Sequence, residues 1–172
     1  MAQIRQMEER EAERVCTLWL QMCADAGTPL PEASAQLILA NLKQYATHQV
    51  ARCFVAEEEH TITGFVTCCV TSHPVMPGLS GEIEELYAQP VAHRQEIQSN
   101  LVRQAVAFMQ AQGVGSIHTS ICVGDEDCPE AELRAFWQSL GWENDMTIFS
   151  IYSNVPGAPA LQRIWDEYRT QS

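Results

Sequence analysis

The stretch Gly81-Glu-Ile-Glu-Glu-Leu-Tyr-Ala-Gln-Pro90 and the helical repeat that follows it decide the fold of this chain. Gly81 and Pro90 bound a run of β-forming residues, and this pattern predicts a strand over residues 81–89. Across residues 91–112, Ile97, Leu101 and Ala105 recur at the spacing of one helix face, and glycine follows at position 113. The sequence therefore places a strand directly before an amphipathic helix.

The segments on either side extend this unit into a series of strands and helices. Val15, Leu18 and Trp19 recur at helical spacing, and Gly27 and Pro29 end that helix. Two β-rich runs flank a polar turn at residues 57–61, as in a hairpin. Mixed hairpin and crossover connections indicate an α/β fold with a partly antiparallel sheet. The expected strands are 4–7, 53–56, 62–71, 81–89, 116–123 and 146–152, and the expected helices are 15–22, 32–48, 91–112, 129–140 and 155–172.

Length and charge limit the domain organisation and the partners. A chain of 172 residues can bury a full core, and no repeat or linker divides it. We therefore expect one domain over residues 1–172, ending in a helical extension over residues 155–172. The net charge of −12 argues against a nucleic-acid partner and favours cationic or neutral small ligands. No apolar run is long enough to cross a membrane, so we expect no membrane partner.

The seven cysteines are scattered along the chain and carry no CxxC pair. A domain of this size needs no disulfide framework, so reduced thiols in the cytoplasm are the simplest interpretation. His118, Cys122 and Cys128 have no fourth ligand at a usual zinc spacing, and we expect no metal. The thiols are expected to act as small buried hydrophobes.

Two segments carry a resemblance to a known family. The element order, together with Glu82-Ile-Glu-Glu-Leu-Tyr-Ala-Gln-Pro90 and Phe136-Trp-Gln-Ser-Leu-Gly-Trp142, resembles the GNAT superfamily of acyl-CoA-dependent N-acyltransferases. In that family a strand ending in a Leu-Tyr-Val-x-Pro-like stretch leads through an Arg/Gln-x-x-Gly-x-Gly/Ala turn into a helix. The resemblance covers most of the chain. It implies a GNAT fold with a mixed central sheet flanked by helices, here with an extra C-terminal helix.

The turn after the strand is the family's cofactor site, where backbone N–H groups at a helix start converge on a pyrophosphate. In this chain the turn is His93-Arg-Gln-Glu-Ile-Gln98, with Glu96 and Gln98 at the two glycine positions. The resemblance implies acetyl-CoA as co-substrate, with His93 and Arg94 available to offset the Glu96 carboxylate. The alternative is an ordinary helix start in which Glu96 complements the helix dipole. The residues expected at the cofactor are Leu86, Tyr87, Ala88, His93, Arg94, Gln95, Glu96, Ile97, Gln98 and Ser99.

An amine acceptor must lose a proton, so a carboxylate is expected on the strand before the turn. Glu82 and Glu84 are the catalytic candidates, and the resemblance favours Glu82 as the base. Side chains alternate along a strand, so these two should share one face with Leu86, and Glu85 should share the other with Tyr87, unless a bulge changes the parity. A solvated acidic strand edge is the alternative interpretation.

The family's general acid is a tyrosine in a Phe-Tyr segment, and Trp137 occupies the corresponding position here. An indole cannot reprotonate the CoA thiolate, and we expect Trp137 in the core. Tyr87, Tyr152 or Cys122 are the alternative donors considered from the sequence.

The resemblance implies an N-acetyltransferase that moves an acetyl group from acetyl-CoA directly to an amine of a small cationic substrate. Because Glu96, Gln98 and Trp137 depart from the family pattern, the alternative is a catalytically impaired GNAT-fold module that binds a ligand or regulates a partner. The family often dimerises, so a homodimer is expected beside the small-molecule acceptor.

Overall fold

The computed structural model of the chain describes residues 2–72, 78–119 and 130–143. Contacts between Cα atoms divide the chain into two units, Met1–Trp142 and Glu143–Ser172, and the account below concerns the first. The predicted strand at residues 146–152 and the predicted helical extension at residues 155–172 lie outside the described residues, as do Cys122 and Cys128.

The described residues form five strands, four α-helices and a short 3₁₀ helix, in the order that the sequence predicts. The strand that decides the fold is β4, and the helix that follows it is α3. The elements are β1 (Gln3–Gln6), η1 (Glu9–Glu11), α1 (Ala12–Asp25), α2 (Glu32–Thr47), β2 (Ala51–Glu58), β3 (Thr61–Ser72), β4 (Leu79–Ala88), α3 (Arg94–Ala111), β5 (Val114–Thr119) and α4 (Glu130–Ser139).

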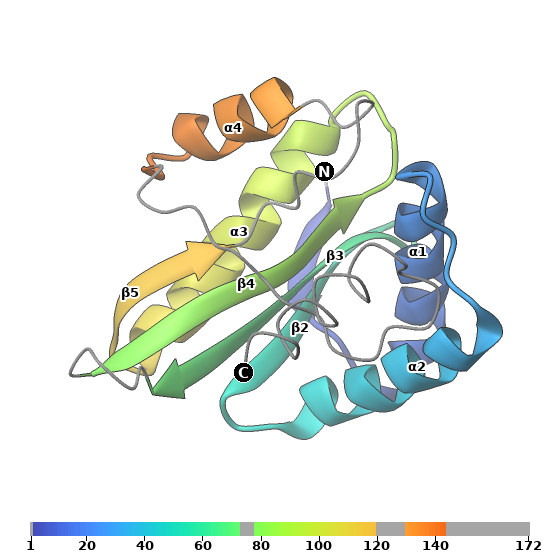
Figure 1. Cartoon of the computed structure of the whole chain (residues 1–172), viewed down its shortest axis with the longest axis horizontal. Helices are drawn as coiled ribbons and strands as arrows, with labels where there is room; N and C mark the ends of the chain where they lie inside the picture. The colour runs from blue at the N-terminus through green and yellow to red at the C-terminus, as the bar shows by residue number, and fades with distance from the viewer. Residues whose placement is uncertain (1, 73–77, 120–129, 144–172) are drawn as a thin grey trace, which may run out of the picture. The chain divides into compact units, whose positions relative to one another are not determined.

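The strands form one sheet in the order β1-β2-β3-β4-β5 (Figure 1). The first four strands pair antiparallel, and β5 pairs with β4 in parallel after the α3 crossover. Antiparallel neighbours need only tight turns, whereas a parallel pair needs a crossover, usually a helix. The predicted α/β fold with a mixed sheet is therefore confirmed.

Helix α3 begins later than its apolar pattern indicates. Pro90 cannot donate a hydrogen bond, and the chain turns sharply after it: the Val91 N–H donates to the Gln89 carbonyl at 2.8 Å and the Arg94 N–H to the Val91 carbonyl at 3.0 Å. The helix therefore starts at Arg94. Among the described residues, none of the helices is long and apolar enough to cross a membrane.

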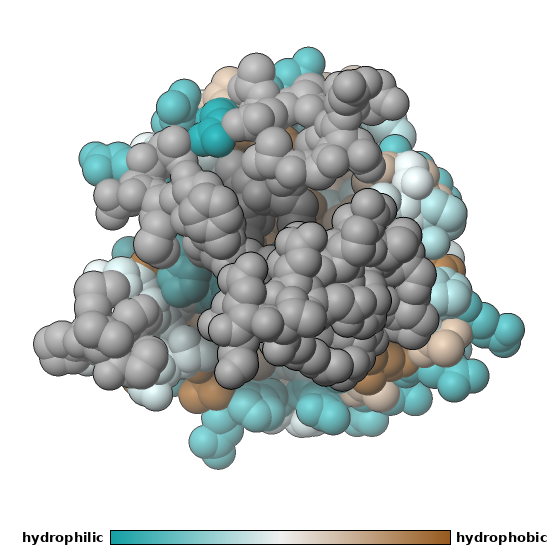
Figure 2. Space-filling model, viewed as in Figure 1, coloured by the Kyte–Doolittle hydropathy of each residue, from teal (hydrophilic) through white to brown (hydrophobic). Residues whose placement is uncertain are grey.

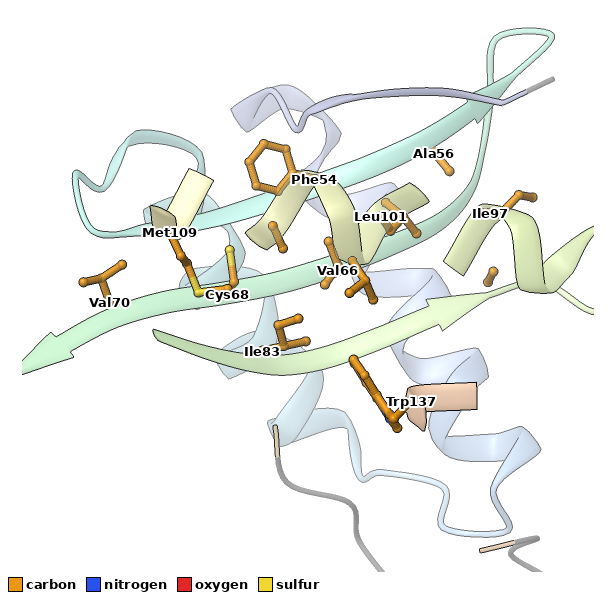
Figure 3. Packing of buried hydrophobic residues seen from close by; sticks show 13 residues of the cluster. Phe54, Ala56, Val66, Cys68, Val70, Ile83, Ile97, Leu101, Met109 and Trp137 are labelled. Carbon is orange, nitrogen blue, oxygen red and sulfur yellow. The ribbon is translucent and has the colours of Figure 1, made fainter. Parts of the chain in front are cut away.

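Each face of the sheet carries its own apolar cluster. On the α3 face, Val66 and Ile83 of the sheet pack with Leu101 of α3 and with Trp137 of α4 (Figure 3). On the opposite face, α1 and α2 pack over Phe65, which is fully buried. Hydrophilic residues surround the rim of the described part of the molecule (Figure 2). The two clusters fix the sheet between its helices, which is where fold stability is generated.

Gly64 allows β3 and β4 to approach closely near the end of β4. It pairs with Ala88, and a Cβ added at Gly64 would lie 2.8 Å from the Tyr87 carbonyl oxygen. Gly81 is also crowded, but there the nearest atom is the sulfur of Met109, at 2.5 Å. A methionine side chain can change rotamer, whereas a strand carbonyl cannot move without disturbing the sheet.

We expect Gly64→Ala to destabilise the fold by about 1–3 kcal/mol, because the added methyl group must push β4 away from β3. Gly81→Ala is the matched control and should cost clearly less, since Met109 can give way. Urea unfolding of the two variants at equal pH measures both values. Equal losses would contradict the close approach at Gly64.

Candidate active site

Strand β5 pairs with the first half of β4, and we call the last described pair, Ile83 and Thr119, the parting point of the two strands. In this pair the Thr119 hydroxyl donates to the Ile83 carbonyl oxygen at 3.0 Å. Beyond this point residues 84–88 of β4 continue to pair with β3. In the described part of the chain, the strand partners of residues 84–88 come from β3 alone, and unpaired backbone N–H and C=O groups of a strand edge can bind a ligand.

A β-bulge lies at the parting point. Thr67 of β3 pairs with Glu85 and the next residue, Cys68, pairs with Ile83, so Glu84 is the extra residue of β4. Ile83 belongs to the cluster on the α3 face, and Glu85 is therefore on the opposite face with Thr67.

The bulge gathers three carboxylates on the α1/α2 face. Glu84 accepts a hydrogen bond from Tyr45 of α2, and Glu82 pairs with Cys69 on the same face. Leu86 packs against the cluster on the α3 face. Glu82 and Glu84 share a face, as predicted. Leu86 lies on the other face because the extra residue resets the alternation, which is the exception that the prediction allowed for a bulge.

Glu84 is held by polar neighbours. The Tyr45 hydroxyl lies 2.5 Å from its Oε2. Burial and the nearby Glu82 carboxylate raise the pKa of Glu84, while the hydrogen bonds from Tyr45 and Cys69 oppose that rise. Burial and Glu84 in turn raise the pKa of the Tyr45 phenol. The phenol donates this hydrogen bond and the carboxylate accepts it.

Glu85 is the functional candidate that the sequence analysis did not select. It is half-buried, and burial together with the charge of Glu84 raises its pKa from the ordinary 4.5 to about 7. A carboxylate that titrates near neutral pH is suited to accept a proton. Only the bulge brings Glu85 beside Glu84, and nothing in the sequence marks the position of the bulge.

Glu82 lies beside His118 of β5. Its Oε2 is 3.9 Å from the His118 Nε2, and the Nδ1 of the same ring lies 3.4 Å from the Ser80 hydroxyl. Both side chains are partly exposed, at 41% for His118 and 36% for Glu82. The imidazole therefore stands at the parting point of the two strands.

The start of α3 is the turn at which the sequence predicts the cofactor pyrophosphate. No side chain caps the helix, and the N-cap residue His93 has non-helical backbone angles. The first-turn N–H groups of a helix have no partner within that helix, so the amides of Gln95 and Glu96 can donate hydrogen bonds to an anion. The side chains of Tyr87, Ala88 and Ile97 are buried.

The polar side chains of the turn have other partners. His93 Nε2 lies 2.8 Å from Glu58 Oε1 in β2. The Arg94 guanidinium lies 5.9 Å from the centre of the Tyr87 ring, and the Tyr87 hydroxyl donates to Asp25 Oδ2 at 2.8 Å. Thus His93 and Arg94 have partners other than Glu96. Among the other predicted cofactor residues, Gln95 and Glu96 are exposed, and Leu86, Gln98 and Ser99 are half-buried.

Trp137 belongs to the core, as predicted. Only 8% of it is exposed, and it packs with Trp142 at 4.8 Å between ring centres. Its indole is therefore no part of the carboxylate face. No group of three or more metal-ligating side chains is found among residues 2–72, 78–119 and 130–143.

A sequence model of the Acetyltransferase (GNAT) family matches residues 6–142. Because this match spans most of the sequence, the chain belongs to the GNAT acetyltransferase family. A search of curated proteins gave no match.

Solved structures share the fold at low sequence identity. A predicted acetyltransferase from Clostridium acetobutylicum, solved with acetyl-CoA, is 12% identical with a TM-score of 0.74, covering 88% of this chain and 96% of that one. A transcriptional regulator from Bacillus halodurans C-125 is 20% identical with a TM-score of 0.72, covering 89% and 100%. An aminoglycoside N-acetyltransferase in complex with CoA is 15% identical with a TM-score of 0.71, covering 90% and 96%. These likenesses establish the fold.

The raised pKa of Glu85 predicts that the folded protein loses stability as the pH rises. Its pKa is higher in the folded protein than in the unfolded chain, so its contribution to stability is present below pH 4.5 and is lost as the pH rises through about 7. We expect Glu85→Gln to raise the free energy of unfolding by about 1–2 kcal/mol at pH 8 and to change it little at pH 4.

Thermal unfolding of wild type and Glu85→Gln at the two pH values measures this difference. Glu59→Gln, in the exposed turn between β2 and β3, is the matched control and should show no pH-dependent gain. A variant that is less stable than wild type at pH 8 would refute the proton-holding role of Glu85.

Proposed function

We propose that this protein is an N-acetyltransferase that transfers the acetyl group of acetyl-CoA directly to an amine of a small cationic substrate. The observation that carries the proposal is that β4 bears three carboxylates on one face, next to its last described pair with β5, and leads into a helix start that no side chain caps. Membership of the GNAT family supports the same chemistry.

The proposed cofactor site runs along the open edge of β4. The pyrophosphate would bind the amides of residues 93–98 at the start of α3, where the helix dipole favours an anion. The pantetheine arm would follow the edge of residues 84–88, which is about 15 Å long at about 3.3 Å per residue. The thioester would then lie at the parting point, beside the carboxylates.

The predicted catalytic carboxylates are Glu82 and Glu84, and Glu85 joins them as a candidate base. Glu84 is occupied by the Tyr45 hydroxyl, whereas Glu85 has a pKa of about 7 and can take a proton from an incoming ammonium. The free amine then attacks the thioester carbonyl. The C–N bond forms, the C–S bond breaks, and the electron pair of that bond leaves with the sulfur.

The proposed acceptor is a small molecule with an amine and further positive charge. Three carboxylates on one face and a net charge of −12 attract a cation and repel an anion. Two structurally similar proteins are aminoglycoside acetyltransferases, one of them solved in complex with sisomicin, which makes aminoglycosides a first class to screen beside polyamines. A homodimer and a cytoplasmic location stay predictions from the sequence.

A ligand-binding or regulatory module is the second candidate, and Glu96 is the observation that favours it. Its carboxylate sits in the first turn of α3, where a pyrophosphate would add like charge. His93 pairs with Glu58, so neutralisation of Glu96 by His93 would require that pair to break. A chain that has lost cofactor affinity would keep this fold.

Calorimetric titration with acetyl-CoA and with CoA separates the two candidates. For the enzyme we expect micromolar binding of both ligands, and tighter binding by about tenfold in Glu96→Gln, because a repulsion of about 1–2 kcal/mol is removed. Glu32→Gln, at the equivalent first turn of α2, is the matched control and should bind like wild type. No binding by wild type, with binding restored by Glu96→Gln, would establish the module instead.

Single substitutions test the carboxylates by acetylation of a polyamine or aminoglycoside acceptor. We expect Glu85→Gln to lower kcat by about 10²–10⁴-fold, as for loss of a general base, and wild-type kcat/KM to rise with pH through about 7. Glu84→Gln, whose carboxylate is tied to Tyr45, should lose less. If Glu82→Gln shows the largest loss and Glu85→Gln is near wild type, the base is Glu82.

A further inference from the structure

The departing sulfur of CoA needs a proton source, and the described tyrosines near the parting point are poor ones. Burial raises the pKa of Tyr45, and its hydroxyl donates to Glu84. Burial and Asp25, which accepts its hydrogen bond, raise the pKa of Tyr87 to about 12. Each phenol thus donates its proton in a hydrogen bond to a carboxylate, which makes that proton harder to lose. Trp137 has no acidic proton to offer and is buried.

His118 has the placement that a proton donor requires. It is the penultimate residue of β5, one position before the last pair of the parallel ladder. Its register partner is Glu82, so its ring lies on the carboxylate face, next to the end of the open β4 edge. A thioester that reaches the parting point along this edge would meet the ring there.

Among the described residues, Nδ1 of the His118 ring has a hydrogen-bond partner and Nε2 has none. Nδ1 lies 3.4 Å from the Ser80 hydroxyl, and Ser80 is 3% exposed and also lies 3.3 Å from Ser116. Nε2 lies 3.9 Å from Oε2 of Glu82. This distance is too long for a hydrogen bond, but it is short enough for the carboxylate to attract an imidazolium charge. No described residue hydrogen-bonds Nε2, so this nitrogen can donate to a ligand atom.

We propose that His118 is the general acid of the reaction, donating its Nε2 proton to the CoA sulfur as the C–S bond breaks. This inference rests on the proposed function. Nitrogen of the acceptor bonds to the acetyl carbon, the electron pair of the C–S bond goes to sulfur, and the proton of His118 converts the thiolate into the thiol. The proton lost by the acceptor returns through solvent to His118, so the cycle balances.

This assignment explains how the chain tolerates a tryptophan where the family has a tyrosine. The donor is moved from α4 to β5, while the indole takes over a packing role in the α3-face cluster. Glu82 then acts on His118 by attracting its charge, and the proton-accepting role is left to the other carboxylates of the face.

The test compares two acyl donors in His118→Gln and wild type. Acetyl-CoA releases a thiolate that benefits from protonation, whereas the selenoester analogue of acetyl-CoA releases a much less basic selenolate. We expect His118→Gln to lower kcat by about 10²-fold with acetyl-CoA, the low end of general-acid effects, and by less than about threefold with the selenoester. His60→Gln, whose side chain is fully exposed in the turn between β2 and β3, is the matched control and should match wild type on both donors.

Calorimetric binding of CoA to His118→Gln shows whether the variant is folded and its cofactor site intact. Equal losses on the two donors, or no loss on either, would overturn the role of His118 and leave the proposed function in place. Failure of wild type to turn over or bind either donor would refute the proposed function, and this inference with it.

Discussion

The extra residue in β4 is the constraint on which the rest of the site depends. A regular strand would send Glu84 and Glu85 to opposite faces. The bulge at Glu84 places both on the α1/α2 face, while Leu86 and Ala88 stay in the cluster under α3. One inserted residue therefore builds a polar face without removing an apolar side chain from the core.

The bulge lies next to the last described pair of β4 and β5. That pair is Ile83 with Thr119, and β4 bulges at the next residue. Bulges increase local twist and bend a strand, while the antiparallel pairing of β4 with β3 continues to Ala88. Gly64 supports this arrangement, because its missing side chain lets β3 follow β4 to Ala88.

The sequence predicts the elements well because periodicity and turn residues are local signals. Within the described residues, the helix patterns, the Gly and Pro breaks and the hairpin appear close to their predicted positions. Trp137 could also be placed in the core, since Phe136 and Leu140 share its helix. In each case the deciding residues lie within one turn or one strand of each other.

The geometry of the site could not be predicted in the same way. Simple alternation separates Glu85 from Glu84, and the bulge that brings them to one face depends on how β4 pairs with Thr67 and Cys68 of β3. The partner of His93 is Glu58, 35 residues earlier, and the partner of Tyr87 is Asp25, 62 residues earlier. No periodic pattern carries information about contacts over such distances.

The acidic face has a further chemical consequence, for Cys69. This thiol lies on the same face as the glutamates, and burial together with Glu84 and Glu82 raises its pKa to about 12. Only a thiolate attacks a thioester at a useful rate. A thioester bound at the parting point would thus face a sulfur that stays protonated, and the glutamates that attract an amine would also protect the protein from acetylating its own cysteine.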